Sequence, residues 1–112
     1  MSEISQALAM KAMDALAMRQ TAIAQNIANA GSETIQRHSV SFEDALKEAA
    51  EEGPEAVRSL VFNIEKQGPE VAGGEIRLDL EMQSSSSTAG RYGALADLLG
   101  RQMQIARAAV RG

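Results

Sequence analysis

Apolar residues recur at helical spacing in two long stretches, one at each end of the 112-residue chain, and a broken, polar segment separates them. The first stretch covers residues 4–30, where no glycine or proline occurs before Gly31, and it predicts a long helix. Because a stripe of this length cannot face water, the helix needs a partner helix. The apolar positions that fall largely on one side of it are Ile4, Leu8, Met13, Leu16, Ile23, Ile27 and Ala30.

The second stretch, residues 89–110, predicts another helix with an apolar side, and the obvious partner of each helix is the other. We therefore expect a mainly α fold, in which long N- and C-terminal helices pair as a coiled-coil-like hairpin. Residues 1–30 and 84–112 form this paired unit, and residues 31–83 connect its two helices. The apolar positions of the second helix are Tyr92, Leu95, Leu98, Leu99, Met103, Ile105, Ala106, Ala109 and Val110.

Part of the first stripe alternates spacings of three and four, which is typical of a coiled-coil seam, and Gln20 is its one polar member. Gln20 has two interpretations. It is either a core amide close to solvent or a contact that sets the register of the helices, and the first is the simpler. The members of the seam are Met13, Leu16, Gln20, Ile23, Ile27 and Ala30.

Capping residues mark the expected ends of the helices. Ser2 or Ser5 can cap the first helix, and its end falls at residues 29–31, since Gly31 tolerates a left-handed backbone. After an irregular loop over residues 31–41, Ser41 with Asp44 three positions later resembles an N-cap. It opens a short helix, residues 42–52, whose apolar face carries Phe42, Ala45, Leu46 and Ala49 and which Gly53-Pro54 ends.

Two short segments of the middle region favour β structure. Residues 60–64 read as a strand that Gly68-Pro69 ends, and a strict apolar–polar alternation at Ile76, Leu78, Leu80 and Met82 follows Gly73-Gly74. Residues 57–65 and 75–82 can then pair as a small β-hairpin, which needs a neighbouring surface because a lone hairpin is marginal in water. The run of residues 84–88 is either a linker or the cap of the last helix.

The last helix also carries Gly90, Gly93 and Gly100, each of which costs ~1 kcal/mol relative to Ala. These glycines suit a helix that other helices approach closely. We expect the termini of an isolated monomer to be frayed or disordered, because this glycine-rich helix needs packing to persist.

Composition and charge narrow the class of protein. Only 3% of the residues are aromatic, and the apolar content comes from Ala, Leu, Ile, Val and six Met, which suit helix–helix packing. The net charge is −4 and no dense Lys/Arg cluster occurs, so we expect no nucleic-acid partner. We expect no membrane span either, because no run is long and apolar enough. Glu3, Lys11 and Asp14 interrupt any signal-peptide core.

The sequence offers no catalytic constellation, so we expect a non-enzymatic protein without a metal or cofactor. The chain has no Cys, and the single His38 lies in a polar loop beside Arg37 without a second metal-ligating partner. The acidic residues that follow most simply form a solvated helix face, and they are Glu43, Asp44, Glu48, Glu51, Glu52 and Glu55. Neither a nucleophile elbow nor a phosphate-binding loop is present.

Several segments, in the same order and at the same spacing, resemble bacterial flagellar rod and hook proteins. Residues 19–30 (RQTAIAQNIANA) are similar to the N-terminal signature of that family. The segments similar to proximal-rod members are residues 41–46 (SFEDAL), 79–82 (DLEM), 91–95 (RYGAL) and 98–101 (LLGR). The chain departs from the family at residues 31–37, where the usual Pro-Gly turn and its aromatic residue are absent.

The resemblance implies a structural subunit of the proximal rod in the flagellar basal body, which assembles helically through its terminal helices into part of the motor drive shaft. It implies export through the flagellar type III apparatus without a cleaved signal peptide. The implied partners are other copies of the chain, other rod proteins, and the adaptor that joins the rod to the membrane ring and export gate. A small cytosolic helical adaptor or export chaperone of the flagellar apparatus is the alternative, although it has no need of both terminal signatures.

The residues expected at the assembly interface lie on both terminal helices, on the apolar stripes and within the N-terminal signature. They are Leu16, Gln20, Ile23, Asn26, Ile27, Asn29, Tyr92, Leu95, Leu99 and Met103.

Overall fold

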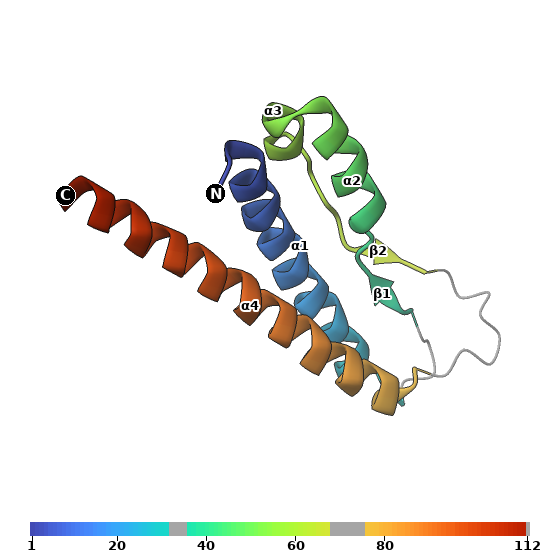
Figure 1. The fold of residues 1–112 in the computed structure, drawn as a ribbon. Helices are drawn as coiled ribbons and strands as arrows, with labels where there is room; N and C mark the ends of the chain where they lie inside the picture. Colours follow the sequence, from blue (N-terminus) through green and yellow to red (C-terminus); the bar gives the residue numbers. More distant parts are fainter. Residues whose placement is uncertain (32–35, 68–75, 112) are drawn as a thin grey trace.

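Helices form most of the molecule, and the expected mainly α fold with paired terminal helices is confirmed (Figure 1). The computed structural model describes residues 1–31, 36–67 and 76–111. It is elongated, with principal extents of 61 × 27 × 13 Å. In chain order the elements are α1 (Glu3–Ala28), β1 (His38–Ser39), α2 (Glu43–Glu52), α3 (Pro54–Arg58), β2 (Glu65–Lys66) and α4 (Leu78–Arg111).

The central element is α1, which lies between α4 on one side and α2 with α3 on the other (Figure 1). Its limits agree with the sequence pattern. Of the two candidate caps Ser2 is the N-cap, and its Oγ accepts a hydrogen bond of 3.1 Å from the Ser5 N–H. Asn29 is the C-cap, and Gly31 follows in the left-handed region with a φ of 92°.

The second long helix, α4, begins eleven residues earlier than the pattern predicts, at Leu78 instead of residue 89, and it runs antiparallel to α1 (Figure 1). The predicted strand over residues 75–82 is therefore wrong for residues 76–82, residue 75 lies outside the described residues, and the serine run is helical. The physical reason is that the side of α4 packed on α1 here is polar, while Leu78, Leu80 and Met82 are exposed. The covered positions are Glu81, Ser84, Ser85 and Thr88, at helical spacing.

The predicted β-hairpin is also wrong, because the two short strands pair differently. β1 and β2 form an antiparallel pair in which His38 lies opposite Lys66 and Ser39 opposite Glu65. Residues 60–64 form no strand, so that prediction is wrong, and Phe62 and Ile64 pack against the core. Gly68-Pro69 and Gly73-Gly74 lie outside the described residues.

The short helices that precede β2 are joined by a sharp turn. α2 matches the predicted helix, but its N-cap is Phe42, which makes no side-chain capping bond, so the predicted Ser41 cap is wrong. Gly53 ends α2 with a φ of 123°, which a glycine adopts without strain. Pro54 then opens α3, a helix that the sequence pattern did not indicate. Val57 of α3 is fully buried.

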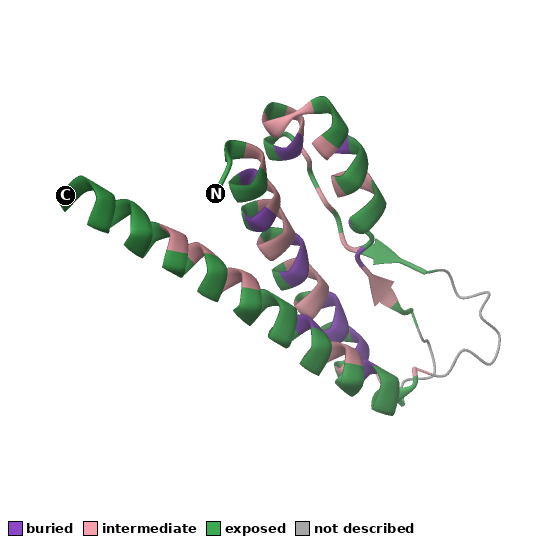
Figure 2. Cartoon of the chain, viewed as in Figure 1, coloured by how far each residue is buried: buried purple, intermediate pink, exposed green. Residues whose placement is uncertain are grey.

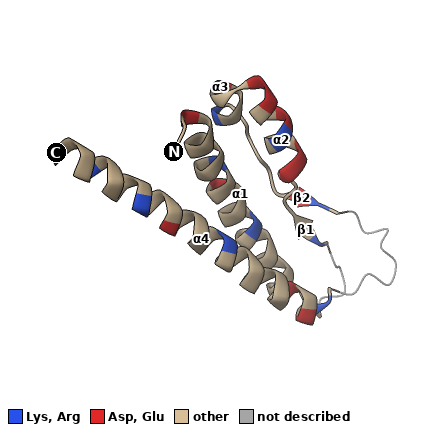
Figure 3. Ribbon diagram, viewed as in Figure 1, with Lys and Arg blue, Asp and Glu red and all other residues tan. Residues whose placement is uncertain are grey.

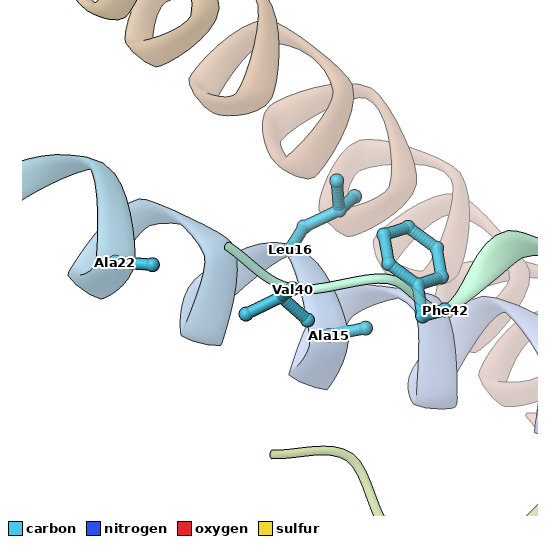
Figure 4. Close-up of a cluster of buried hydrophobic side chains, with 5 residues drawn as sticks. All are labelled: Ala15, Leu16, Ala22, Val40 and Phe42. Carbon is cyan, nitrogen blue, oxygen red and sulfur yellow. The ribbon is translucent and has the colours of Figure 1, made fainter. Parts of the chain in front are cut away.

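The buried side chains form two clusters along α1 (Figure 2). The first, drawn in Figure 4, joins α1 to the segment before α2 and consists of Ala15, Leu16, Ala22, Val40 and Phe42. The second joins α1 to α2 and α3 and consists of Ala7, Ala49 and Val57. Phe42 also meets Phe62 edge to face, with ring centroids 5.9 Å apart. Alanine is frequent in both clusters, which allows the helices to approach closely.

Candidate assembly interface

Three of the expected interface residues are buried inside the chain, between α1 and its neighbours. Leu16 is 1% exposed, Ile23 5% and Asn26 0%. Gln20 is half-buried, and its Nε2 donates a 3.2 Å hydrogen bond to the Ser85 carbonyl of α4. Its Oε1 is buried without a partner. Gln20 is thus an amide at the edge of the core that also contacts α4.

A buried polar junction ties the end of α1 to β1 and to the start of α4. The Asn26 Oδ1 accepts the His38 N–H at 2.6 Å, and its Nδ2 donates to the His38 carbonyl at 2.8 Å and to Glu81 Oε2 at 3.3 Å. Arg37 Nε donates to Glu81 Oε1 at 2.9 Å. Since the Glu81 side chain is 4% exposed, these donors replace the water that its carboxylate has lost. We call these four residues the Asn26 junction.

A second polar cluster, around Arg19, joins α1 to α2. The Arg19 guanidinium donates to both Glu43 oxygens at 2.9 and 2.7 Å and to the Val40 carbonyl at 2.6 Å. It also lies 4.4 Å from the centroid of the Phe42 ring. The hydrogen bond from Arg19 is the main reason that the pKa of Glu43 falls from 4.5 to about 2, and burial opposes the fall. Arg91 of α4 approaches the same carboxylate at 3.9 Å.

The other expected interface residues are more accessible. Ile27 and Asn29 are half-buried at the end of α1, and Leu95 and Leu99 are half-buried on α4. Tyr92 is 40% exposed and Met103 is 56% exposed. Exposed apolar side chains occur at both ends of α4, with Leu78, Leu80 and Met82 in its first turns and Met103, Ile105 and Val110 in its last turns.

We call residues 98–111 of α4 the C-terminal arm, and its outer part projects past the start of α1 (Figures 1 and 2). The Met1 amino group donates to Gln102 Oε1 at 3.2 Å, so the residues after Gln102 extend beyond the end of α1. Apolar side chains on the arm are open to solvent, namely Leu98, Met103, Ile105 and Val110, and Val110 is 88% exposed.

Two apolar grooves flank Leu16. The first has a volume of about 570 Å³ and lies over α1, between α2 and α4. The second has a volume of about 500 Å³ and lies between α1 and α4, with Gln20, Thr88 and Tyr92 among its lining residues. We call the first the α2 groove. It is lined by Leu8, Ala12, Leu16, Phe42, Glu43, Leu46, Lys47, Ala50, Arg91, Ala94 and Leu95.

The glycines of α4 are not sites of close helix approach within one chain. A Cβ added at Gly90, Gly93 or Gly100 would meet nothing within 4 Å among the described residues. The expectation that other helices come close at these positions is therefore wrong for the helices of the same chain.

No protein-family model matches the chain, and a search of curated proteins found no significant match. Among the described residues, the helices lack any stretch of the length and apolarity needed to cross a membrane. No group of three or more His, Asp or Glu side chains within residues 1–31, 36–67 and 76–111 could hold a metal ion.

Proposed function

We propose that this chain is a structural subunit of the proximal rod of the bacterial flagellar basal body, of the FlgB type, and that it assembles helically through its terminal helices. It forms part of the motor drive shaft in the periplasm and has no catalytic role. Its partners are further copies of itself, other rod proteins, and the adaptor between the rod, the membrane ring and the export gate. It reaches the rod through the flagellar type III export apparatus, without a cleaved signal peptide.

The observation that carries this proposal is that the segments resembling rod proteins meet in space. Asn26, from residues 19–30, hydrogen bonds with Glu81, from residues 79–82. Arg19 pairs with Glu43 of residues 41–46, and Arg91 of residues 91–95 approaches the same carboxylate. Segments that are distant in the sequence thus contact one another in the fold. If each segment resembled the family by chance, there would be no reason for these contacts.

The exposed apolar surface supports assembly in particular. Met103, Ile105 and Val110 of the C-terminal arm are 56%, 61% and 88% exposed. Apolar side chains gathered on one projecting element are typical of protein contact surfaces. Contacts between two different surfaces of identical subunits form a ring where the rotation between neighbours closes, and an open helical assembly where it does not.

The test is to delete the gene in its own bacterium and to probe purified basal bodies for the chain. A rod subunit is present in the purified basal bodies, and its deletion abolishes filaments and motility. Restoring the wild-type gene recovers both. The alternative, a cytosolic adaptor or export chaperone, predicts that the chain is missing from purified basal bodies and that some rod assembly persists after deletion. Full motility in the deletion strain would contradict both functions.

A further inference from the structure

We propose that the C-terminal arm of one copy of this chain docks into the α2 groove of a second copy. This inference rests on the proposed assembly function for the identity of the occupant, and it names the two surfaces that meet. Three observations support the docking contact without relying on the proposed function. They are the shape of the groove, the apolar pattern of the arm and the charges beside the two surfaces.

The α2 groove has the form of a helix bundle that lacks one helix. Leu8, Ala12 and Leu16 of α1 follow one another at intervals of four residues, so they form a row along the floor. Phe42, Leu46 and Ala50 form a row of the same spacing on the α2 side, and Ala94 and Leu95 form the α4 side. An apolar helix laid between α2 and α4 would complete this bundle.

The arm presents a matching apolar row. Leu99, Met103, Ala106 and Val110 follow spacings of four, three and four, which places them on one side of the helix. Met103 and Val110 are separated by about 10 Å along the axis, and Leu8 and Leu16 by about 12 Å, at ~1.5 Å per residue. The groove floor from Leu8 to Leu16 and the outer part of the arm's row from Met103 to Val110 are thus each about two turns long.

The charges beside the two surfaces are opposite. The arm contains Arg101, Arg107 and Arg111 and no acidic residue, so its formal charge is +3. Arg101 pairs with Asp97, directly before the arm, at 3.1 Å, so the proposed pairing with α2 rests on Arg107 and Arg111. In α2 the five carboxylates of Glu43, Asp44, Glu48, Glu51 and Glu52 outweigh the single Lys47, which gives −4 (Figure 3). The lining of the groove carries Lys47 and Arg91 beside Glu43, which is paired with Arg19. The acidic excess of α2 lies next to the lining, where Asp44 and Glu51 are exposed about one turn to either side of Lys47. They can therefore pair with the arginines of a docked arm.

An arm cannot fill the groove of its own chain. α4 is continuous from Leu78 to Arg111, and one side of the groove is formed by Arg91, Ala94 and Leu95 of that same helix. The residues after Gln102 extend away from it, past the N-terminus of α1. The arm and the groove are different surfaces, so each copy offers one of each and the contact propagates from copy to copy.

The test uses site-specific cross-linking of the full chain, which has no cysteine of its own. One copy carries Met103→Cys on the arm, and a second, size-tagged copy carries Lys47→Cys at the groove. The matched control replaces Lys47→Cys with Ser86→Cys, an exposed position on α4. Under mild oxidation we expect at least tenfold more mixed dimer from the arm–groove pair than from the control pair. Equal yields from the two pairs would overturn the proposal.

A charge exchange tests the electrostatic part of the contact. Arg107→Glu with Arg111→Glu on the arm copy should reduce the mixed dimer at least fivefold, because the arm then repels α2. Asp44→Lys with Glu51→Lys on the groove copy should restore the yield to within twofold of the original. Failure of this restoration, with both variants shown to be folded by circular dichroism, also counts against the proposal.

The outcomes separate this inference from the proposed function. If the chain is found in purified basal bodies but the arm–groove pair does not cross-link preferentially, the docking proposal fails and the rod function stands. If the pair cross-links preferentially but the chain is missing from basal bodies, the self-association stands and the rod function fails.

Discussion

Asn26 of α1 and Glu81 of α4 are joined by a buried hydrogen bond, although 55 residues separate them in the sequence. Asn26 also holds both the N–H and the carbonyl of His38, so one side chain fixes the positions of α1, β1 and α4. The Asn26 amide has partners for both its oxygen and its nitrogen, so a packing that separates it from His38 and Glu81 leaves buried polar groups unpaired.

The Asn26 junction yields the first prediction. Asn26→Ala should lower the free energy of unfolding by about 2–3 kcal/mol, since it leaves buried polar groups of His38 without partners. Asn26→Asp should cost at least as much, because it places a second carboxylate beside Glu81. Urea denaturation followed by circular dichroism measures both. The control is Asn63→Ala at an exposed position, which should change the value by less than about 0.5 kcal/mol.

The second prediction concerns acid stability and Glu43. Because the pKa of Glu43 is lowered from 4.5 to about 2 in the folded chain, the charged form stabilises the fold above pH 4.5. That contribution is lost as the pH falls towards 2. The Glu43 side chain is 50% exposed, so solvent screening limits the effect to about 1 kcal/mol. Glu43→Gln should therefore lower the free energy of unfolding by about 1 kcal/mol at pH 7 and have little effect at pH 2.

Paired denaturation curves of wild type and Glu43→Gln from pH 7 to pH 2 test this prediction. Glu48→Gln, at an exposed position on the same helix, is the control and should show little pH-dependent difference. A stability gap for Glu43→Gln that stays constant over this range would show that the loss does not come from the carboxylate charge.

The third prediction separates residues of the internal core from residues open to a partner. Leu16→Ala removes a side chain that is 1% exposed, and it should cost about 2–5 kcal/mol of monomer stability. Met103→Ala removes one that is 56% exposed, and it should change monomer stability by less than about 0.5 kcal/mol. In sedimentation velocity, Met103→Ala should weaken self-association although the monomer remains folded. Equal monomer stabilities for the two variants would be inconsistent with the burial of Leu16.

The terminal helices could be predicted from the sequence because each signal is long and local. Residues 4–30 hold an apolar stripe through seven helical turns without glycine or proline, and few other structures satisfy such a pattern. The first turns of α4 could not be predicted in this way. Their covered side is Glu81, Ser84, Ser85 and Thr88, so it is polar, and small serines favour close packing that a hydropathy pattern does not register.

Most hydrogen-bond partners in the candidate site could not be predicted from the sequence. Asn26 stood out as part of a signature, but its partners His38 and Glu81 are set by the tertiary fold. The apolar–polar alternation around Glu81 predicted a strand with Glu81 on the side that faces solvent. In the structure Glu81 is buried, with 3% of its surface exposed. Arg19 carried one usable signal, since it is a cation in a mostly apolar helix that precedes an acidic segment.

The fourth prediction concerns Gly93. A Cβ at this position would meet nothing within 4 Å, so Gly93→Ala adds helix propensity without a clash. The free energy of unfolding of the monomer should rise by about 0.5–1 kcal/mol. Gly53→Ala is the contrasting variant and should destabilise, because the φ of Gly53 is 123° and a side chain is strained there. If Gly93→Ala stabilises the monomer but weakens self-association, a helix of another copy approaches at this position.

The last prediction concerns the C-terminal arm of the isolated monomer. Residues 103–111 are the last turns of α4 and extend past α1, so they lack the packing that holds the rest of the helix and should fray. Their amides should exchange with solvent much faster than those of residues 84–95, which lie against α1, in hydrogen exchange at micromolar concentration. Protection of the arm should rise with protein concentration as other copies cover it, and Gly100→Ala should raise it in the monomer. Strong protection of the arm at the lowest concentration would mean that the arm is stable without a partner.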